Sequence, residues 1–268
     1  MSLDEISAYR VNPGLLDFLE RKCAGSGLRQ DQFRILDFGC GRGQSVAGLR
    51  RLGWQAYGLE VHDKWIRFAE PGLRDAGAYE PGVLRLGRTV GGPGFEDGFF
   101  NVVYSSSVFE HVFDLDAAVG EITRVTAPGG WGYHWFIGRW SPIEGHLGMP
   151  LIHWMPKNFL RRWMVAAAVV AGMEPGWQTV AGMGFWQRVK FYYDFSVDQT
   201  VYRSVADYRR AFQQAGQRVA LDTLNHPRLS QLHGSAIGWI PGGVRLVEAA
   251  CTAFKTVILS TEKPVSTL

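Results

Sequence analysis

A glycine-rich turn between an apolar run and a helical pattern constrains the fold of this chain most. The run Ile35–Phe38 contains a single acid, Asp37. The turn that follows consists of Gly39, Cys40, Gly41, Arg42 and Gly43. Glycines adopt positive φ angles and let a ligand approach the main chain closely, and N–H groups at a helix start favour negative charge. The pattern therefore predicts strand, turn and helix, with a nucleotide-like or carboxylate-bearing cofactor over the turn.

The spacing of the glycines distinguishes between cofactors. A dinucleotide fingerprint needs a third glycine where this chain has Gln44, which disfavours an NAD-dependent enzyme. The pattern present is Asp37-x-Gly39-x-Gly41-x-Gly43. It resembles the first motif of class I S-adenosylmethionine-dependent methyltransferases. The resemblance implies S-adenosyl-L-methionine as the cofactor, bound by Asp37 and the turn with its Cys40; the plain alternative is a turn that merely connects strand to helix.

A second apolar run, Trp54–Glu60, ends in an acid. Glu60 lies about as far beyond the glycines as the ribose-binding carboxylate of doubly wound nucleotide folds. We therefore interpret Glu60 as the acceptor for the ribose hydroxyls. The alternative is a solvated acid at a strand end.

A longer block supports the same resemblance. Three motifs keep the order and spacing found in the small-molecule (type 11-like) branch of that family: Phe95-x-Asp97-x-x-Phe100-Asn101, Glu110-His111, and Glu121-Ile-x-Arg-Val-x-x-Pro128-Gly-Gly. The resemblance covers residues 33–137 and marks them as the cofactor-binding core. Two departures are Asn101 for the usual Asp, and Thr89 where relatives carry an acid near the adenine amino group. The backbone around Val90, or a hydroxyl group, is then expected to contact adenine.

The periodicities predict an α/β fold. The resemblance implies a Rossmann-like, doubly wound, seven-stranded sheet with helices on both faces and an antiparallel final hairpin. Strands are predicted at 35–38, 54–60, 81–86, 100–104, 131–137, 217–224 and 252–261, and helices at 12–23, after Gly43, at 64–69 (cut by Pro71-Gly72), 116–125 and 203–215. The whole chain, 1–268, is read as one methyltransferase domain, with 138–202 and 225–250 as irregular, lid-like insertions that cap the substrate.

Ligands of open α/β sheets bind at the carboxyl ends of the strands. Ser105 and Ser106, at the end of the fourth predicted strand, are therefore expected to contact the cofactor. His111 follows that strand and is the first candidate for a catalytic base, with His146 and His153 as competitors. For each of these histidines a structural role is the alternative.

A metal site is not expected. Some relatives that act on quinone precursors or RNA ribose carry Glu-x-x-Glu-His here, and its acids and histidine hold a divalent ion. In this chain the first position is Ser107, so we predict metal independence.

The composition of the chain indicates its cellular compartment but not its substrate. The chain has 46% hydrophobic residues, a net charge of +3 and three widely separated cysteines. These values predict a soluble, cytoplasmic protein of a reducing compartment, with no signal peptide and no nucleic-acid partner. The acceptor is expected to be a small molecule, a glycan or a lipid-linked compound, methylated on oxygen. A homodimer and a non-catalytic module that binds the cofactor or a partner remain alternatives.

Residues 151–173 are the least expected stretch. Its apolar side chains recur at helical spacing: Phe159, Leu160, Trp163, Met164, Ala167 and Ala171. Lys157, Arg161 and Arg162 fall on the other side, which is typical of a helix at a membrane surface. The alternative, which we favour on the sequence, is that the apolar face packs on the sheet or on a second subunit and roofs the pocket.

Overall fold

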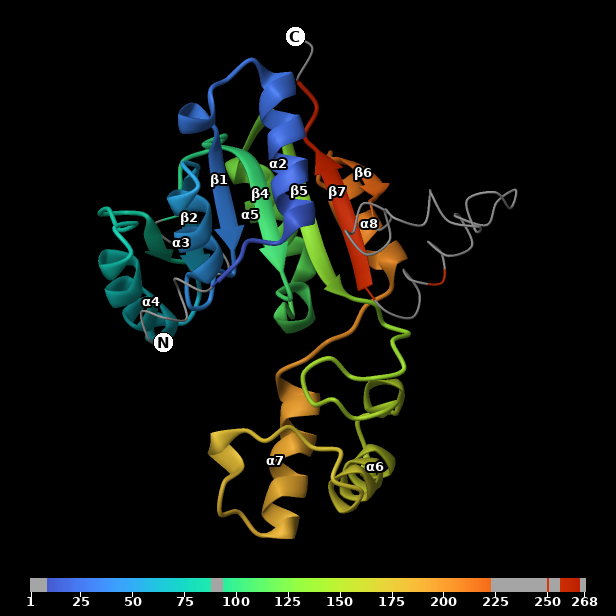
Figure 1. Cartoon of the computed structure of the whole chain (residues 1–268). Helices are drawn as coiled ribbons and strands as arrows, with labels where there is room; N and C mark the ends of the chain where they lie inside the picture. Colours follow the sequence, from blue (N-terminus) through green and yellow to red (C-terminus); the bar gives the residue numbers. More distant parts are fainter. Residues whose placement is uncertain (1–8, 88–93, 223–249, 251–255, 266–268) are drawn as a thin grey trace, which may run out of the picture.

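The computed structural model describes residues 9–87, 94–222, 250 and 256–265 (Figure 1). Seven strands form one sheet in the order β3-β2-β1-β4-β5-β7-β6. The strands are β1 (Arg34–Phe38), β2 (Gln55–Glu60), β3 (Leu84–Leu86), β4 (Phe100–Ser106), β5 (Thr126–Ile137), β6 (Arg218–Leu221) and β7 (Thr256–Glu262). Only the pairings of β7, with β5 and β6, are antiparallel. The predicted seven-stranded sheet with its antiparallel final hairpin is confirmed.

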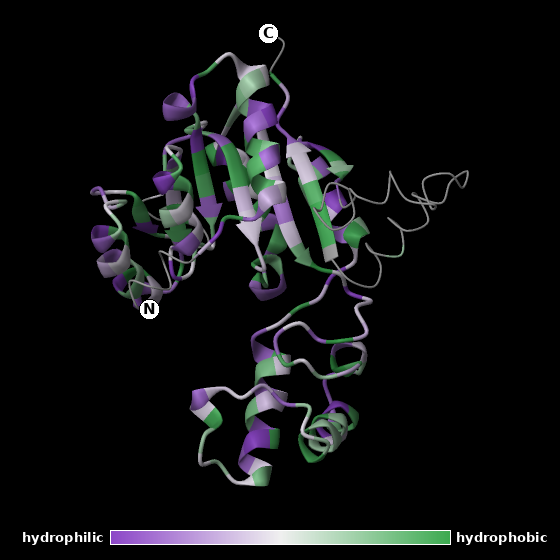
Figure 2. Ribbon diagram, viewed as in Figure 1, coloured by the Kyte–Doolittle hydropathy of each residue, from purple (hydrophilic) through white to green (hydrophobic). Residues whose placement is uncertain are grey.

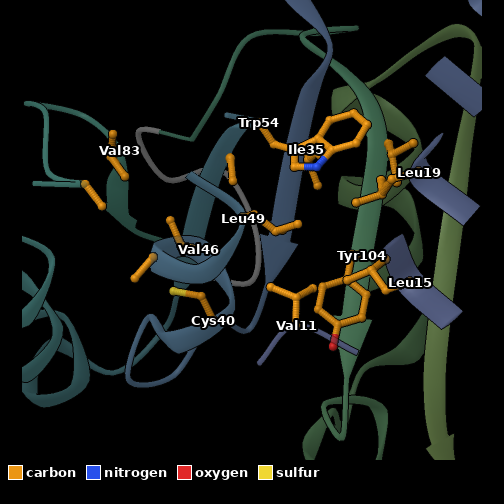
Figure 3. Packing of buried hydrophobic residues seen from close by; sticks show 14 of the residues in the cluster. Val11, Leu15, Leu19, Ile35, Cys40, Val46, Leu49, Trp54, Val83 and Tyr104 are labelled. Carbon is orange, nitrogen blue, oxygen red and sulfur yellow. The ribbon is translucent and has the colours of Figure 1, made fainter. Parts of the chain in front are cut away.

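Helices cover both faces of the sheet because its central strands are apolar on both sides. One face packs on α2 (Pro13–Ser26), α3 (Gln44–Arg51) and α4 (Asp63–Asp75), around Leu15, Leu49 and Tyr104 among others. Figure 3 shows part of this core. The other face packs on α5 (Leu115–Val125) and α8 (Val205–Gln214). Neighbouring residues of β1 supply both cores, Ile35 the first and Leu36 the second.

Helix α4 differs from the sequence prediction, which ended it at Pro71. The helix continues through Pro71 to Asp75. A proline inside a helix removes one backbone hydrogen bond and crowds the preceding turn. Here the buried face of α4 continues beyond the proline, since Ile66, Ala69 and Leu73 all lie in the core.

The segment between β5 and α8 forms a helical unit of its own, which we call the cap (residues 138–202). It contains α6 (Phe159–Val170), α7 (Phe185–Asp198) and the short 3-10 helices η3 (Ile152–Trp154) and η4 (Gln178–Val180). A separate hydrophobic core holds it together, with Val165, Val189 and Tyr192 fully buried. Figure 1 shows the cap extending from the edge of the sheet at which the parallel strands end. The helix expected within 151–173 is present as α6, whereas the irregular structure expected for the rest of the segment was wrong and α7 was not predicted.

Helix α6 buries the face opposite to the one expected from its apolar spacing. Its small residues contact the rest of the cap, namely Val165, Ala166, Ala168 and Val169. Phe159 and Trp163 are 66% and 62% exposed. The apolar face therefore lies mostly exposed, with Trp163 in edge-to-face contact with Trp186 of α7.

Arg161, assigned to the polar side from the sequence, is buried. Its guanidinium donates hydrogen bonds to the carbonyl oxygens of Met155 and Ser196. Lys157 donates to the carbonyl oxygens of Val197 and Thr200. The last carbonyls of a helix lack partners within the helix, and cationic side chains satisfy them. These two residues therefore fasten α6 to the end of α7.

None of the helices in the described ranges is long and apolar enough to cross a membrane.

The buried guanidinium predicts a stability effect confined to one of two adjacent arginines. Arg161→Ala should lower the free energy of unfolding by about 2 kcal/mol or more, because two carbonyl groups lose a charged donor. The exposed neighbour provides the control: Arg162→Ala should change stability by less than about 0.5 kcal/mol. Urea denaturation of both variants measures the difference, and equal effects would contradict the role given to Arg161.

Candidate active site

Two of the three turn glycines are required by protein packing. Gly39 and Gly43 have φ angles of 78° and 71°. A Cβ atom at Gly39 would lie 2.6 Å from a methyl group of Val108, and one at Gly43 would lie 2.8 Å from a methyl group of Leu73. These glycines let the turn pack against the segment after β4 and against α4.

Gly41 differs from the other two because its surroundings are open. Its φ angle is 50°, and a Cβ atom built there would have no heavy atom of a described residue within 4 Å. The turn thus presents unoccupied space beside bare backbone, at the carboxyl end of β1. This arrangement fits a cofactor that lies against the main chain at Gly41.

The carboxylate of Glu60 fixes the shape of this region. One of its oxygens accepts a hydrogen bond from the N–H of Gly41 at 2.9 Å. The other accepts from the N–H groups of Val61 and His62, at 2.8 and 3.0 Å. A carboxylate offers about four acceptor positions, so three are used by the backbone. Glu60 therefore holds the glycine turn against the end of β2 and keeps about one position for a ligand hydroxyl.

Asp37 lies beneath the same turn and is buried. Burial, with the nearby charge of Glu60 as a smaller cause, raises the pKa of Asp37 to about 7. Its neighbour across the strand pair is Tyr104 of β4. Burial, followed by the charge of Asp37, raises the pKa of Tyr104, whereas hydrogen bonds with Ser106 and Ser45 lower it. Figure 3 shows the Tyr104 hydroxyl directed past Val11, at the end of the hydrophobic cluster.

Two residues predicted to contact the cofactor use their side chains elsewhere. Cys40 lies in the core, where its sulfur would be 2.6 Å from a Cβ atom built at Gly58, and burial raises its pKa. The hydroxyl of Ser105 is hydrogen-bonded at 2.8 Å to Nδ1 of the fully buried His134. Burial lowers the pKa of this histidine to about 3, so it is neutral. Val90 and the segment 225–250, apart from residue 250, lie outside the described residues.

The structure brings together the two histidines predicted as catalytic candidates. His111 belongs to the 3-10 helix η2 (Phe109–His111) after β4, and His146 belongs to the cap. Their Nε2 atoms are 3.0 Å apart. The turn that carries His111 begins next to Val108, which packs on Gly39, so the pair lies at the same sheet edge as the glycine turn.

The end of the cap is fastened to the turn that carries His111. Nδ1 of His111 lies 2.7 Å from the carbonyl oxygen of Gln199. The N–H of Val201 donates to the carbonyl oxygen of Glu110 at 2.7 Å, and Arg203 donates to the carbonyls of Val112 and Phe113. These bonds fix the position of the cap relative to the sheet at this point.

Two buried carboxyl groups surround the histidine pair. Glu144 accepts hydrogen bonds from the N–H groups of His146 and Leu147, from Nδ1 of His146 and from the hydroxyl of Tyr202. Burial by itself would raise its pKa, but these bonds lower the pKa below its usual range. Glu110 lies 3.9 Å from His146 Nε2. Its oxygens have no hydrogen bond to a described residue, and burial raises its pKa to about 7.

Sequence reasoning missed Glu144 and Tyr202. The spacing Glu144-x-His146 was a signal, since an acid two residues before a histidine can reach its ring within one turn. No local pattern pointed to Tyr202, which is the last residue of the cap and lies far from Glu144 in the sequence.

His153 is a weaker candidate for a base than the pair. Its Nε2 contacts the carbonyl oxygen of Arg139 at 3.0 Å and so carries the proton, while Nδ1 is buried without a partner in the described structure. The lone pair on Nδ1 is therefore buried and cannot take a proton from an acceptor substrate.

Within the described ranges, no group of three or more His, Cys, Asp or Glu residues could hold a metal ion. Metal independence stays a prediction from the missing acid at Ser107.

Comparison with known proteins agrees with this geometry. A model of the methyltransferase domain matches residues 36–133. The chain is 28% identical over 132 residues to a ubiquinone biosynthesis O-methyltransferase of Albidiferax ferrireducens, a match covering 49% of this chain and 50% of that protein. It is 25% identical over 158 residues to a malonyl-[acyl-carrier protein] O-methyltransferase of Erwinia billingiae, covering 56% and 59%. The matches thus span about half the length of these relatives.

A solved S-adenosylmethionine-dependent methyltransferase from Mesorhizobium loti has the same fold. Its TM-score is 0.52 at 14% identity, over 96% of this chain and 99% of that one. The fold of the chain is thus one shared with a solved S-adenosylmethionine-dependent methyltransferase. Residues 36–133 match the methyltransferase domain family.

The open space at Gly41 predicts a loss of cofactor affinity without loss of the fold. Gly41→Ala should weaken binding of S-adenosylhomocysteine at least tenfold, because the added methyl group occupies the space beside the backbone. The positive φ angle itself should cost about 1–2 kcal/mol of stability. Isothermal titration calorimetry measures the affinity.

Gly77 provides the matched control for this variant. It has a φ angle of 64° and equally open surroundings, but it follows α4. Gly77→Ala should therefore lose similar stability and keep full cofactor affinity. Unchanged affinity in Gly41→Ala would contradict the assigned position of the cofactor.

Proposed function

We propose that this chain transfers the methyl group of S-adenosyl-L-methionine to an oxygen atom of a small-molecule acceptor. The observation that carries the proposal is the meeting of His111 and His146 at the sheet edge that also holds the glycine turn. Glu60 lies close enough to His111 to be among the charges that act on its pKa, after burial and the contact with Gln199. The cofactor region and the base are thus neighbours.

The chemistry of the cofactor indicates which roles the residues of the site have to fill. A sulfonium methyl group is already activated, so the protein has to place the acceptor in line with it. An oxygen acceptor also has to lose a proton, and histidine is the usual base. We assign the backbone at Gly41, the Glu60 carboxylate, Asp37 and Ser106 to the cofactor, and the histidine pair to the proton.

The acceptor is proposed to enter between the sheet edge and the cap. A row of aromatic contacts leads from His146 to the exposed surface of the cap. The Tyr202 hydroxyl lies 3.2 Å from Nδ1 of His146, and His153 contacts both Tyr202 and Trp154. Trp154 in turn is in edge-to-face contact at 6.0 Å with Trp140, and both tryptophans are exposed. Such a surface suits a flat, apolar or sugar-containing compound. The second candidate is a module that binds the cofactor without methylating any acceptor.

Replacement of the base tests the proposed activity. His111→Asn should lower kcat about 100- to 10,000-fold on an acceptor found by mass spectrometry of methylated products. Cofactor affinity should remain, because this side chain makes no contact with the glycine turn. His153→Asn should lower kcat less than tenfold, because this ring contributes to the aromatic surface but is not placed to take the proton. If the parent protein binds S-adenosylhomocysteine but methylates nothing in a broad acceptor screen, the non-catalytic alternative is correct.

The exposed face of α6 supports a lipid-linked acceptor. Phe159, Leu160, Trp163 and Val170 form an outward-facing stripe, which Trp186 of α7 extends through an edge-to-face contact with Trp163 at 6.1 Å. Figure 2 shows α6 mostly in hydrophobic colours at the end of the cap remote from the sheet. Tryptophan favours the membrane–water interface, and a stripe without charges suits it. We propose that this stripe rests on a lipid surface.

Vesicle sedimentation tests this part of the proposal. The full chain should sediment with anionic vesicles, and the double change of Trp163 and Trp186 to Ala should weaken binding at least tenfold, about 1.4 kcal/mol. Leu52→Ala, an exposed apolar position on the sheet domain, should leave binding unchanged. If the chain does not bind vesicles but forms a dimer, and the double change dissociates that dimer, the stripe is a contact with a second copy of the chain.

A further inference from the structure

The proton positions of the histidine pair can be derived from its neighbours. Nδ1 of His111 lies 2.7 Å from the carbonyl oxygen of Gln199. A carbonyl oxygen only accepts hydrogen bonds, so Nδ1 of His111 carries a proton. In a neutral imidazole the other nitrogen, Nε2, then has a lone pair and no proton.

The same reasoning applies to His146. Its Nδ1 lies 3.2 Å from a carboxylate oxygen of Glu144 and 3.2 Å from the Tyr202 hydroxyl. Tyr202 donates its own proton to Glu144, so both neighbours present lone pairs to Nδ1. Nδ1 of His146 therefore carries a proton as well, and Nε2 of a neutral His146 would have none.

Two lone pairs cannot face each other at hydrogen-bond distance, and the two Nε2 atoms are 3.0 Å apart. We infer that His111 and His146 hold one additional proton between their Nε2 atoms, so that the pair carries a single positive charge. Glu144 is the positioning residue that enforces this state, because it fixes the proton of His146 on Nδ1.

The charges around the pair place the cation on His146. Glu144 is bonded to it, and Glu110 lies 3.9 Å from its Nε2. These acids outweigh the effect of burial and raise the pKa of His146, whereas burial lowers the pKa of His111. Other titratable groups that act on the pair are Tyr202 beside His146, and Glu60, whose charge reaches His111.

The shared proton defines how the pair acts as a base, an inference that rests on the proposed methyl transfer. At a pH where the pair has released this proton, no hydrogen bond holds the two Nε2 atoms together, and an Nε2 lone pair can accept a hydrogen bond from the acceptor hydroxyl. The acceptor oxygen forms a bond to the methyl carbon while the carbon–sulfur bond breaks and its electrons remain on sulfur. The hydroxyl proton moves to Nε2 and restores the singly charged pair.

Nuclear magnetic resonance of the full chain with ¹⁵N-labelled histidine tests the inference without requiring activity. His146 should remain doubly protonated at least one pH unit above the ordinary histidine value of about 6.5, a tenfold gain in proton affinity. His111 should be neutral with its proton on Nδ1. Two neutral rings at pH 7, each titrating separately near 6.5, would overturn the inference.

A variant at Glu144 gives a second test that a merely structural role would not reproduce. In Glu144→Gln, the amide oxygen can accept from the two backbone N–H groups, and the amide nitrogen then donates toward His146 Nδ1. In neutral His146 the single ring proton should move from Nδ1 to Nε2. The pair should lose its positive charge at a pH at least one unit lower than in the parent protein. Glu174→Gln, which alters a different ion pair of the cap, should change neither.

Activity separates this inference from the proposed function. If the resonances show the shared proton but His111→Asn retains turnover, the pair is real and its role as a base is wrong. If His111→Asn abolishes turnover while both histidines titrate independently, the base stands and the shared proton is overturned.

Discussion

The carboxylate of Glu60 holds together the two turns on which the cofactor region depends. It accepts backbone hydrogen bonds from Gly41 in the turn after β1 and from Val61 and His62 after β2. A buried carboxylate is stable only when its oxygens are hydrogen-bonded, and here the backbone supplies most of those bonds. The open space beside Gly41 exists because this anchor keeps the turn in place. The residue assigned to the ribose is therefore also a structural residue.

Burial of charge organises the rest of the carboxyl edge. Asp37 and Glu110 both have pKa values raised to about 7 by burial, whereas Glu144 is kept ionised by the hydrogen bonds it accepts. His146 lies against both Glu144 and Glu110, which raise its pKa. The methyltransferase core supplies Glu110 and His111, and the cap supplies Glu144 and His146. The site is thus complete only when the cap is attached to the sheet.

The cap shows where sequence patterns mislead. In α6 the helical spacing of large apolar residues was correct, but the face it marked is exposed. Close approach of α6 to α7 requires small side chains, so Ala166 and Ala168 are buried while Trp163 is not. Arg161 looked like a surface charge until α7 supplied carbonyl groups for it at Ser196. Hydrophobicity by itself did not distinguish a face that packs from a face left for a partner.

The sequence by itself determined the α/β class, the glycine turn and the acid at Glu60, because each follows from local periodicity or from a motif of fixed spacing. Its resemblance to the methyltransferase domain family supplied the seven-stranded sheet. The tertiary structure decided what depends on contacts between distant segments. In the structure the side chains of Cys40 and Ser105 are buried in the core. His111 contacts His146, and His146 contacts Tyr202. Such contacts depend on how the cap is attached to the sheet. A local sequence pattern contains no information on which distant residues meet.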